Sequence, residues 1–155
     1  LTTSAAVGAA IEQARSVPGA LLDLGESWAA LHFLLTGEIP MPREEALRRG
    51  VAWDDASLEN VLMGGQVTSF RSPVGAARYL APAQVAHLAQ ELARITPEAF
   101  AERYDAAALA EEHIPPGPWG DDPQTQTWLV DVFRQLVEFF GAAAGAGEGV
   151  LVLLS

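Results

Sequence analysis

Cysteine and lysine are both absent from this sequence of 155 residues. Without cysteine, the chain cannot be a small scaffold held together by disulfides. All nine basic residues are arginine and stand against twenty acidic residues, which gives a formal net charge of −11. A negative field of this size repels phosphate backbones, so we expect no nucleic-acid partner. A basic protein partner fits this charge well.

Long hydrophobic runs are absent as well. The longest purely aliphatic stretch, residues 150–154, is far shorter than the ~20 residues that a membrane span needs. No basic stretch is followed by an apolar one, so we find no signal peptide, and we expect a cytoplasmic protein without membrane contact. Because the chain begins at Leu1 rather than at methionine, we also expect that native N-terminal residues precede it.

What is present indicates one folded domain over residues 1–155. Half of the residues are hydrophobic and 19% are charged, which excludes a disordered chain. A chain of this length buries enough surface for an independent core. No internal repeat and no long linker divides the sequence.

Helical spacing dominates the hydrophobic pattern, and capping residues mark several helix starts. Thr96-Pro97 predicts one helix that continues to about Glu112 and stacks Phe100 on Tyr104. A longer helix from Asp122 places Trp128 on a broad apolar face together with Phe133. Helices are expected over residues 3–15, 24–36, 44–49, 82–95, 97–112 and 122–140.

Three short segments are typical of strands: residues 66–70, 76–80 and 150–154. The last contains only aliphatic residues, so we expect it to be the central strand of the sheet. The predicted class is therefore α+β, a helix-dominated single domain with a small mixed or antiparallel sheet.

Trp28 and His32 lie one helical turn apart and are the first candidate binding residues. In one interpretation they line a pocket, with the imidazole as a base or a ligand-binding group. In the other, which the apolar character of this helix favours, His32 is a core histidine bonded to backbone. If the protein has a pocket, we expect Trp28 and His32 to line it.

Trp119 is the third candidate binding residue. It follows a proline-rich loop and precedes Asp121 and Asp122, so it could belong to a binding rim. The alternative, which we favour, is a hydrophobic plug that holds the loop against the following helix, because large aromatic side chains contribute most through buried area.

Catalytic and metal-binding patterns are weak. Residues 25–29 read Gly-Glu-Ser-Trp-Ala, one residue away from the nucleophile elbow of hydrolases, but the sequence lacks the alternation of strands and helices that an elbow needs. Ser27 more simply begins the helix of Trp28. His87 and Glu91 share a helix face, yet a zinc site needs three or four ligands. We therefore predict no catalytic residue, no metal and no cofactor.

The sequence resembles the YfbM-like family, domain of unknown function 1877. The segment DLGESWAALHFLLTG (residues 23–37) resembles the opening motif of that family, and LENVLMGG (residues 58–65) follows in the same order. Further similar positions are Arg78-Tyr79-Leu80, Pro82, Val85, Tyr104, Ile114-Pro115 and Trp119. The resemblance covers nearly the whole chain. It implies a small single α+β domain and implies no reaction.

Two functional hypotheses remain. The first is a non-enzymatic interaction protein that binds another protein, with a basic partner favoured by charge; neutralisation of a cationic toxin would be a special case. The second is a small-molecule-binding protein or enzyme that uses a pocket near Trp28 and His32. A deep cavity at these two residues would favour the second hypothesis, and an exposed acidic or apolar patch would favour the first.

Overall fold

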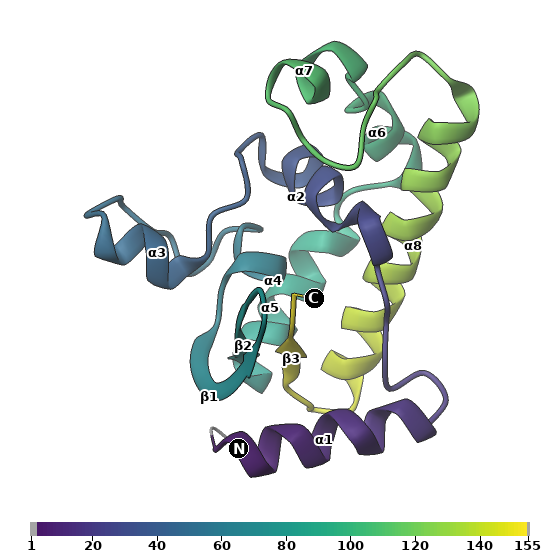
Figure 1. Cartoon of the computed structure of the whole chain (residues 1–155). Helices are drawn as coiled ribbons and strands as arrows, with labels where there is room; N and C mark the ends of the chain where they lie inside the picture. The colour runs from purple at the N-terminus through teal and green to yellow at the C-terminus, as the bar shows by residue number, and fades with distance from the viewer. Residues whose placement is uncertain (1–2, 155) are drawn as a thin grey trace.

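The computed structural model describes residues 3–154 and shows helices arranged around a small sheet (Figure 1). This confirms the helix-dominated α+β class. In chain order the elements are α1 (Ser4–Ser16), a 3-10 helix (Gly25–Ser27), α2 (Trp28–Thr36), α3 (Arg43–Arg48), α4 (Asn60–Met63), β1 (Gln66–Ser72), β2 (Gly75–Leu80), α5 (Pro82–Ala93), α6 (Pro97–Glu102), α7 (Ala106–Glu111), α8 (Pro123–Gly145) and β3 (Val150–Val152).

Short polar side chains and prolines set the helix starts, as the sequence predicted. The side chains of Thr3, Thr96 and Asp122 each accept a hydrogen bond from a backbone N–H in the first turn of the following helix. Proline occupies the first turn of α5, α6 and α8, where no backbone donor is needed. Gly37 ends α2 in the left-handed conformation, with φ of 75°.

The sheet is antiparallel, with the order β1-β2-β3. The C-terminal strand therefore lies at an edge, and our prediction that it is central was wrong; β2 holds the middle position. Val150 and Val152 are nonetheless buried, because helices cover the sheet. An aliphatic run indicates that the side chains of a strand are buried. Whether the strand is central or at an edge depends instead on how many strands the sheet contains.

The core forms where α5 and α6 pack against α8, with α2 contributing its buried face. Phe100 of α6 stacks on Phe133 of α8, with ring centroids 4.2 Å apart and planes 4° from parallel. Stacked aromatic pairs of this kind add to the free energy gained from buried area. One continuous cluster of buried side chains results.

The helix predicted over residues 97–112 is broken into α6 and α7. Asp105 accepts a hydrogen bond from the Ala108 N–H and begins α7 as a new helix. Tyr104 falls in the break and donates its hydroxyl hydrogen bond to the Gly120 carbonyl over 2.6 Å, so Phe100 does not stack on it. A capping aspartate inside a helical pattern competes with helix continuation, and here the cap prevails.

Trp128 does not share the buried face of α8. Leu129, Phe133, Leu136 and Phe140 form that face at spacings of four, three and four, whereas Trp128 is 39% exposed. Its position one residue before Leu129 turns it by about 100° around the helix, away from the core.

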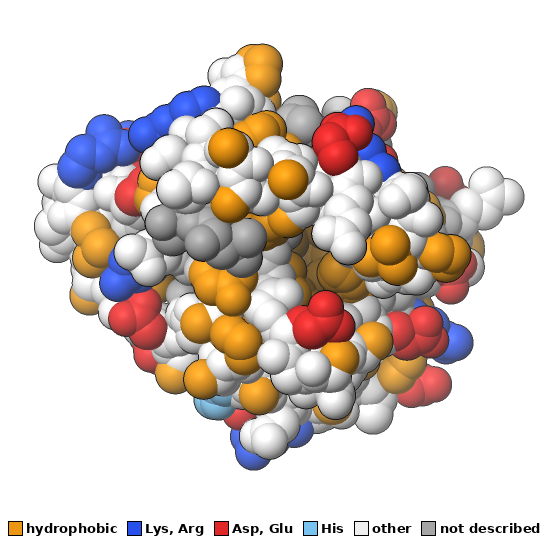
Figure 2. Space-filling view, turned by 90° about the horizontal axis from the view of Figure 1, so that it is seen from below, with side chains coloured by type: hydrophobic (Ala, Val, Ile, Leu, Met, Phe, Trp, Pro, Cys, Tyr) orange, Lys and Arg blue, Asp and Glu red, His pale blue; other side chains and the backbone are white. Residues whose placement is uncertain are grey.

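At the end of the molecule occupied by α1, the surface is partly hydrophobic. Hydrophobic side chains cover much of the face seen from below, and charged side chains lie mostly toward its rim (Figure 2). Of α1 itself, only Val7 is fully buried.

Candidate functional site

His32 lies on the buried face of α2 and is only 2% exposed. Burial, and secondly the positive charge of Arg78, lowers the pKa of His32 from 6.5 to about 4. The imidazole is therefore neutral at neutral pH. Trp28, one turn earlier, is half-buried and packs against the core.

Two open surface hollows of the described residues have no lining from Trp28, His32 or Trp119. One hollow lies on α8, and the other is lined by Arg43, Asp55, Gly65, Gln66 and Gln84. A small-molecule site at Trp28 and His32 therefore stays a prediction.

Trp119 is half-buried in the loop between α7 and α8. Its ring packs against the core cluster, and its indole N–H donates a 2.6 Å hydrogen bond to the carbonyl of Ile114. Both contacts tie the loop to the protein. A ring held in this way presents little free surface to a partner.

Arg78, which the sequence analysis named only as a position similar to the family and not as a site residue, is a buried charge in the middle of β2. Its Nη2 donates a 2.6 Å hydrogen bond to the Leu62 carbonyl, and its Nη1 lies 3.7 Å from Oε1 of Glu44. Burial lowers the pKa of Arg78, and the charge of Glu44 partly opposes this. The ion pair ties α3 to the sheet.

Arg78 Nε and Glu44 Oε2 are both buried and have no hydrogen-bond partner among residues 3–154. Unpartnered buried polar atoms are uncommon in folded proteins, and here both belong to one ion pair. The sequence does indicate that Arg78 points to the buried face of a strand, because Ala76 and Leu80, two positions before and after it, are apolar. Nothing local indicated Glu44, which lies 34 positions earlier in the chain.

Asn60 forms a hydrogen-bond network that attaches the segment around α3 to the rest of the protein, in addition to the Glu44–Arg78 ion pair. Its Oδ1 accepts from the indole N–H of Trp53, and its Nδ2 donates to the carbonyls of Asp54 and Ser57. Together with the Glu44–Arg78 pair, this network holds residues 38–59, which we call the arm. The arm carries α3 and stands away from the body of the molecule (Figure 1).

The arm exposes hydrophobic side chains and arginines at the same place. Ile39, Leu47 and Val51 are each about half exposed. Arg48 and Arg49 are mostly exposed, and both pair with the single carboxylate of Glu45. The tip of the arm therefore combines apolar surface with two exposed arginines, while the arm as a whole carries six carboxylates and three arginines.

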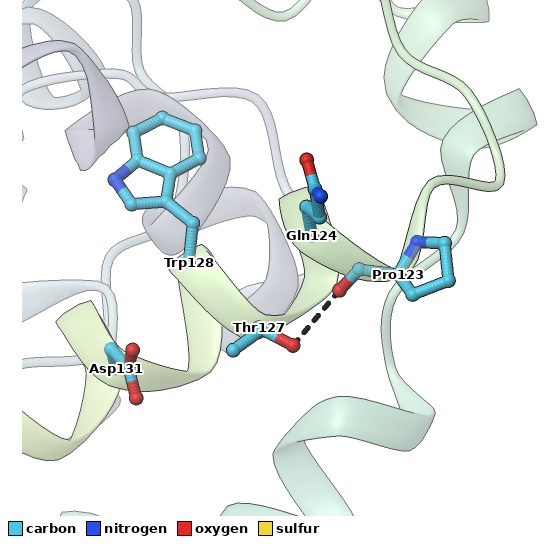
Figure 3. Close-up of a pocket in the computed structure, with 5 residues that line it drawn as sticks. All are labelled: Pro123, Gln124, Thr127, Trp128 and Asp131. Atoms are coloured by element: carbon cyan, nitrogen blue, oxygen red, sulfur yellow. Dashed lines mark hydrogen bonds between the residues drawn. The ribbon is translucent and has the colours of Figure 1, made fainter.

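The hollow on α8 has a volume of about 410 Å³ and is open to solvent. Its lining comes from the first three turns of α8, and we call it the Trp128 hollow (Figure 3). It is lined by Pro123, Gln124, Thr127, Trp128 and Asp131. The Thr127 hydroxyl donates to the Pro123 carbonyl within the first turns of the helix, while the Trp128 ring stands out from the helix.

Seven exposed carboxylates lie between residues 97 and 122, at the end of the molecule formed by α6, α7 and the start of α8 (Figure 1). We call this region the acidic end. They are Glu98, Glu102, Asp105, Glu111, Glu112, Asp121 and Asp122. Arg103 is the one arginine of the segment, and its Nη1 is held by the carbonyls of Leu34 and Leu35.

Tyr104 responds to the charge of the acidic end. Its pKa is raised by burial and, in addition, by the charges of Asp121 and Asp122. The negative charge of the loop that precedes α8 therefore reaches Tyr104, between α6 and α7. The acidic end and the Trp128 hollow adjoin at this helix start.

The metal and serine patterns considered from the sequence can be compared with the structure. Within residues 3–154, no three His, Asp or Glu side chains come together as metal ligands. Ser27 is buried in the 3-10 helix and donates its hydroxyl to the Leu24 carbonyl. No helix in the described part of the chain is long and apolar enough to span a membrane.

Comparison with known proteins supports the fold and the family. The chain is similar to the crystal structure of YfbM from Escherichia coli, described as a protein of unknown function, with a TM-score of 0.61 and 18% sequence identity. The match covers 94% of this chain and 92% of that chain. No curated protein matches the sequence. The family model described as Domain of unknown function (DUF1877) matches residues 6–153, and the chain therefore belongs to this family.

Proposed function

We propose that the protein is a non-enzymatic interaction protein that binds a basic partner at the Trp128 hollow and the acidic end. The observation that carries the proposal is the exposed ring of Trp128, which lies beside Asp131 in an open hollow. A cytoplasmic location is part of the proposal, and the absence of cysteine is compatible with it.

Trp128 has the properties of an interaction anchor. Tryptophan is enriched among the residues that contribute most to protein interfaces, and its face attracts arginine and lysine side chains. Asp131, one turn further along α8, can accept a charge-assisted hydrogen bond from such a cation. The hollow thus offers both an apolar and an ionic contact to one basic side chain.

The acidic end supplies long-range attraction. The acidic end contains seven carboxylates and a single arginine. That arginine is already hydrogen-bonded to the end of α2. A surface of one sign accelerates encounter with partners of the opposite sign and disfavours partners of the same sign. This supports a basic partner and opposes binding of nucleic acid.

The proposal is tested with a fluorescent peptide of alternating arginine and leucine, whose binding is followed by fluorescence anisotropy. We expect binding that weakens strongly when salt rises from about 50 to about 300 mM, because screening shortens the reach of the carboxylates. We expect Trp128→Ala to weaken binding by about tenfold, as for an interface anchor.

Val74→Ala is the matched control, because Val74 is also an exposed hydrophobic side chain but lies in the turn between β1 and β2. It should bind the peptide as the wild type does. Equal affinity of the Trp128→Ala and Val74→Ala variants would show that the hollow is not the binding site.

A further inference from the structure

The buried ion pair of Arg78 and Glu44 leaves both groups incompletely bonded. Nη1 of Arg78 lies 3.7 Å from Oε1 of Glu44, which is too long for a hydrogen bond. Arg78 Nε and Glu44 Oε2 have no hydrogen-bond partner among residues 3–154, although both atoms are buried. A carboxylate that fits an arginine well accepts two parallel N–H bonds from the guanidinium. Glu44 therefore occupies the place of such a carboxylate without making its two bonds.

The helix that carries Glu44 is weakly attached to the body. Ala46 is the one fully buried residue of α3. Asn60 and His87 hold the arm further along the chain, where His87 Nε2 lies 2.9 Å from the Ala56 carbonyl. Among residues 3–154, the pair with Arg78 is the only ion pair or hydrogen bond that joins an α3 side chain to the body. Loss of that pair would therefore leave α3 free to move.

A polar hollow of about 380 Å³ lies where the arm meets the body. It is lined by Arg43 and Asp55 of the arm and by Gly65, Gln66 and Gln84 of the body. Arg43 directly precedes Glu44 in the chain, and Gln66 pairs across the sheet with Tyr79, the residue after Arg78. A shift of α3 away from the body would therefore widen this hollow toward the ion pair.

We propose that Arg78 is the centre of a binding site for a small carboxylate, and that Glu44 fills this site as an internal substitute. The two oxygens of the ligand accept hydrogen bonds from Nε and one Nη of Arg78, which supplies the partner that Nε lacks. Glu44 leaves as the ligand enters, so one negative charge replaces another beside the buried guanidinium. The bond from Nη2 to the Leu62 carbonyl keeps the guanidinium in place, and the exchange frees α3 from the body.

Chemical rescue with formate tests the site. Glu44→Ala leaves Arg78 without its carboxylate and should lower the midpoint of thermal unfolding. For a dissociation constant of about 20 mM, ~200 mM sodium formate should raise this midpoint by about 3 to 6 °C over that in equimolar sodium chloride. Glu45→Ala is the matched control, because it removes the neighbouring carboxylate, which pairs with arginines at the surface. An equal response of the two variants to formate would overturn the inference.

A second variant keeps the shape of the side chain. Glu44→Gln should fold even if Glu44→Ala does not, and an amide binds a guanidinium less strongly than a carboxylate does. Glu44→Gln should therefore bind formate about tenfold more tightly than the wild type does, as titrated by the unfolding midpoint. Adding Arg78→Met to Glu44→Gln should abolish the response. A response that persists without Arg78 would overturn the inference.

Trypsin, which cleaves after arginine, reports the release of α3 in the wild-type protein. With ~200 mM formate, cleavage after Arg48 and Arg49 should be about twofold faster or more than in equimolar chloride, because proteolysis follows the population of the locally open form. Cleavage after Arg94, exposed at the end of α5, should not change. Equal rates after Arg48 and Arg49 in formate and chloride would show that Glu44 is not displaced and would overturn the inference.

Discussion

Arg78 is a charge placed where water cannot reach it. Its side chain is 2% exposed, and its two contacts are one carbonyl and one carboxylate at 3.7 Å. Removing one partner of a buried ion pair is strongly destabilising, because the other partner is left without compensation. Arg78 therefore couples the stability of the sheet to the position of the arm through Glu44.

Arg78→Met should lower the free energy of unfolding by about 2 to 4 kcal/mol, measured by urea denaturation. Methionine fills a similar volume but leaves Glu44 Oε1 and the Leu62 carbonyl without the guanidinium. Arg71→Met is the matched control on the neighbouring strand, where the side chain is exposed, and should change stability by less than about 0.5 kcal/mol. Equal stability of the two variants would contradict the buried position of Arg78.

The junction between α4 and β1 depends on two consecutive glycines. Gly65 has φ of +92°, and a Cβ at this position would lie 2.8 Å from the carbonyl oxygen of Tyr79. The close approach lets β1 begin directly beside β2, with Gln66 paired to Tyr79. Any larger residue would push the strands apart at the start of β1.

Gly65→Ala should therefore lower the free energy of unfolding by at least about 2 kcal/mol, since it adds backbone strain and a clash with fixed backbone. Gly120→Ala is the control, because a Cβ there meets nothing within 4 Å and its φ is not positive. Thermal unfolding of both variants measures the difference. A Gly65→Ala protein as stable as Gly120→Ala would disprove the close packing of this junction.

Charge is distributed unevenly over the molecule, and a histidine is buried in its interior. Carboxylates gather around α6, α7 and the start of α8, and the arm carries six carboxylates and three arginines. His32 is enclosed beside the one continuous core cluster. Most helices contribute to that core. Protonation of His32 should therefore change the free energy of unfolding of the whole domain.

The pH dependence of stability follows from the lowered pKa of His32. Between pH 6.5 and about 4, the unfolded chain binds a proton at this residue and the folded chain does not. Stability should therefore fall as pH falls through this window, by up to about 3 kcal/mol from His32 alone. Urea denaturation at several pH values measures this slope.

His32→Gln should flatten the slope, since glutamine does not titrate. His113→Asn is the control: His113 is exposed with φ of 54°, a conformation that asparagine tolerates. The control should keep the wild-type slope. If His32→Gln also keeps it, the imidazole is not the group that titrates on unfolding.

The sequence by itself determined most of the helices and most of their starts, but it missed α4 and the break between α6 and α7, and α8 continues to Gly145, past the predicted end at residue 140. Capping side chains at Thr3, Thr96 and Asp122 and the left-handed Gly37 act within a few residues, so their effects are visible locally. Periodic apolar residues likewise predicted the helix-dominated α+β class and the burial of His32 on α2. The family resemblance was confirmed over residues 6–153.

Only the tertiary structure decided which surfaces face each other and which stay in water. The edge position of β3, the pairing of Glu44 with Arg78 and the exposure of Trp128 each depend on segments far apart in the chain. A hydrophobic residue reports that burial is favourable, but the packing of its neighbours decides whether burial occurs. For that reason the Trp128 hollow and the arm could not be found from sequence spacing.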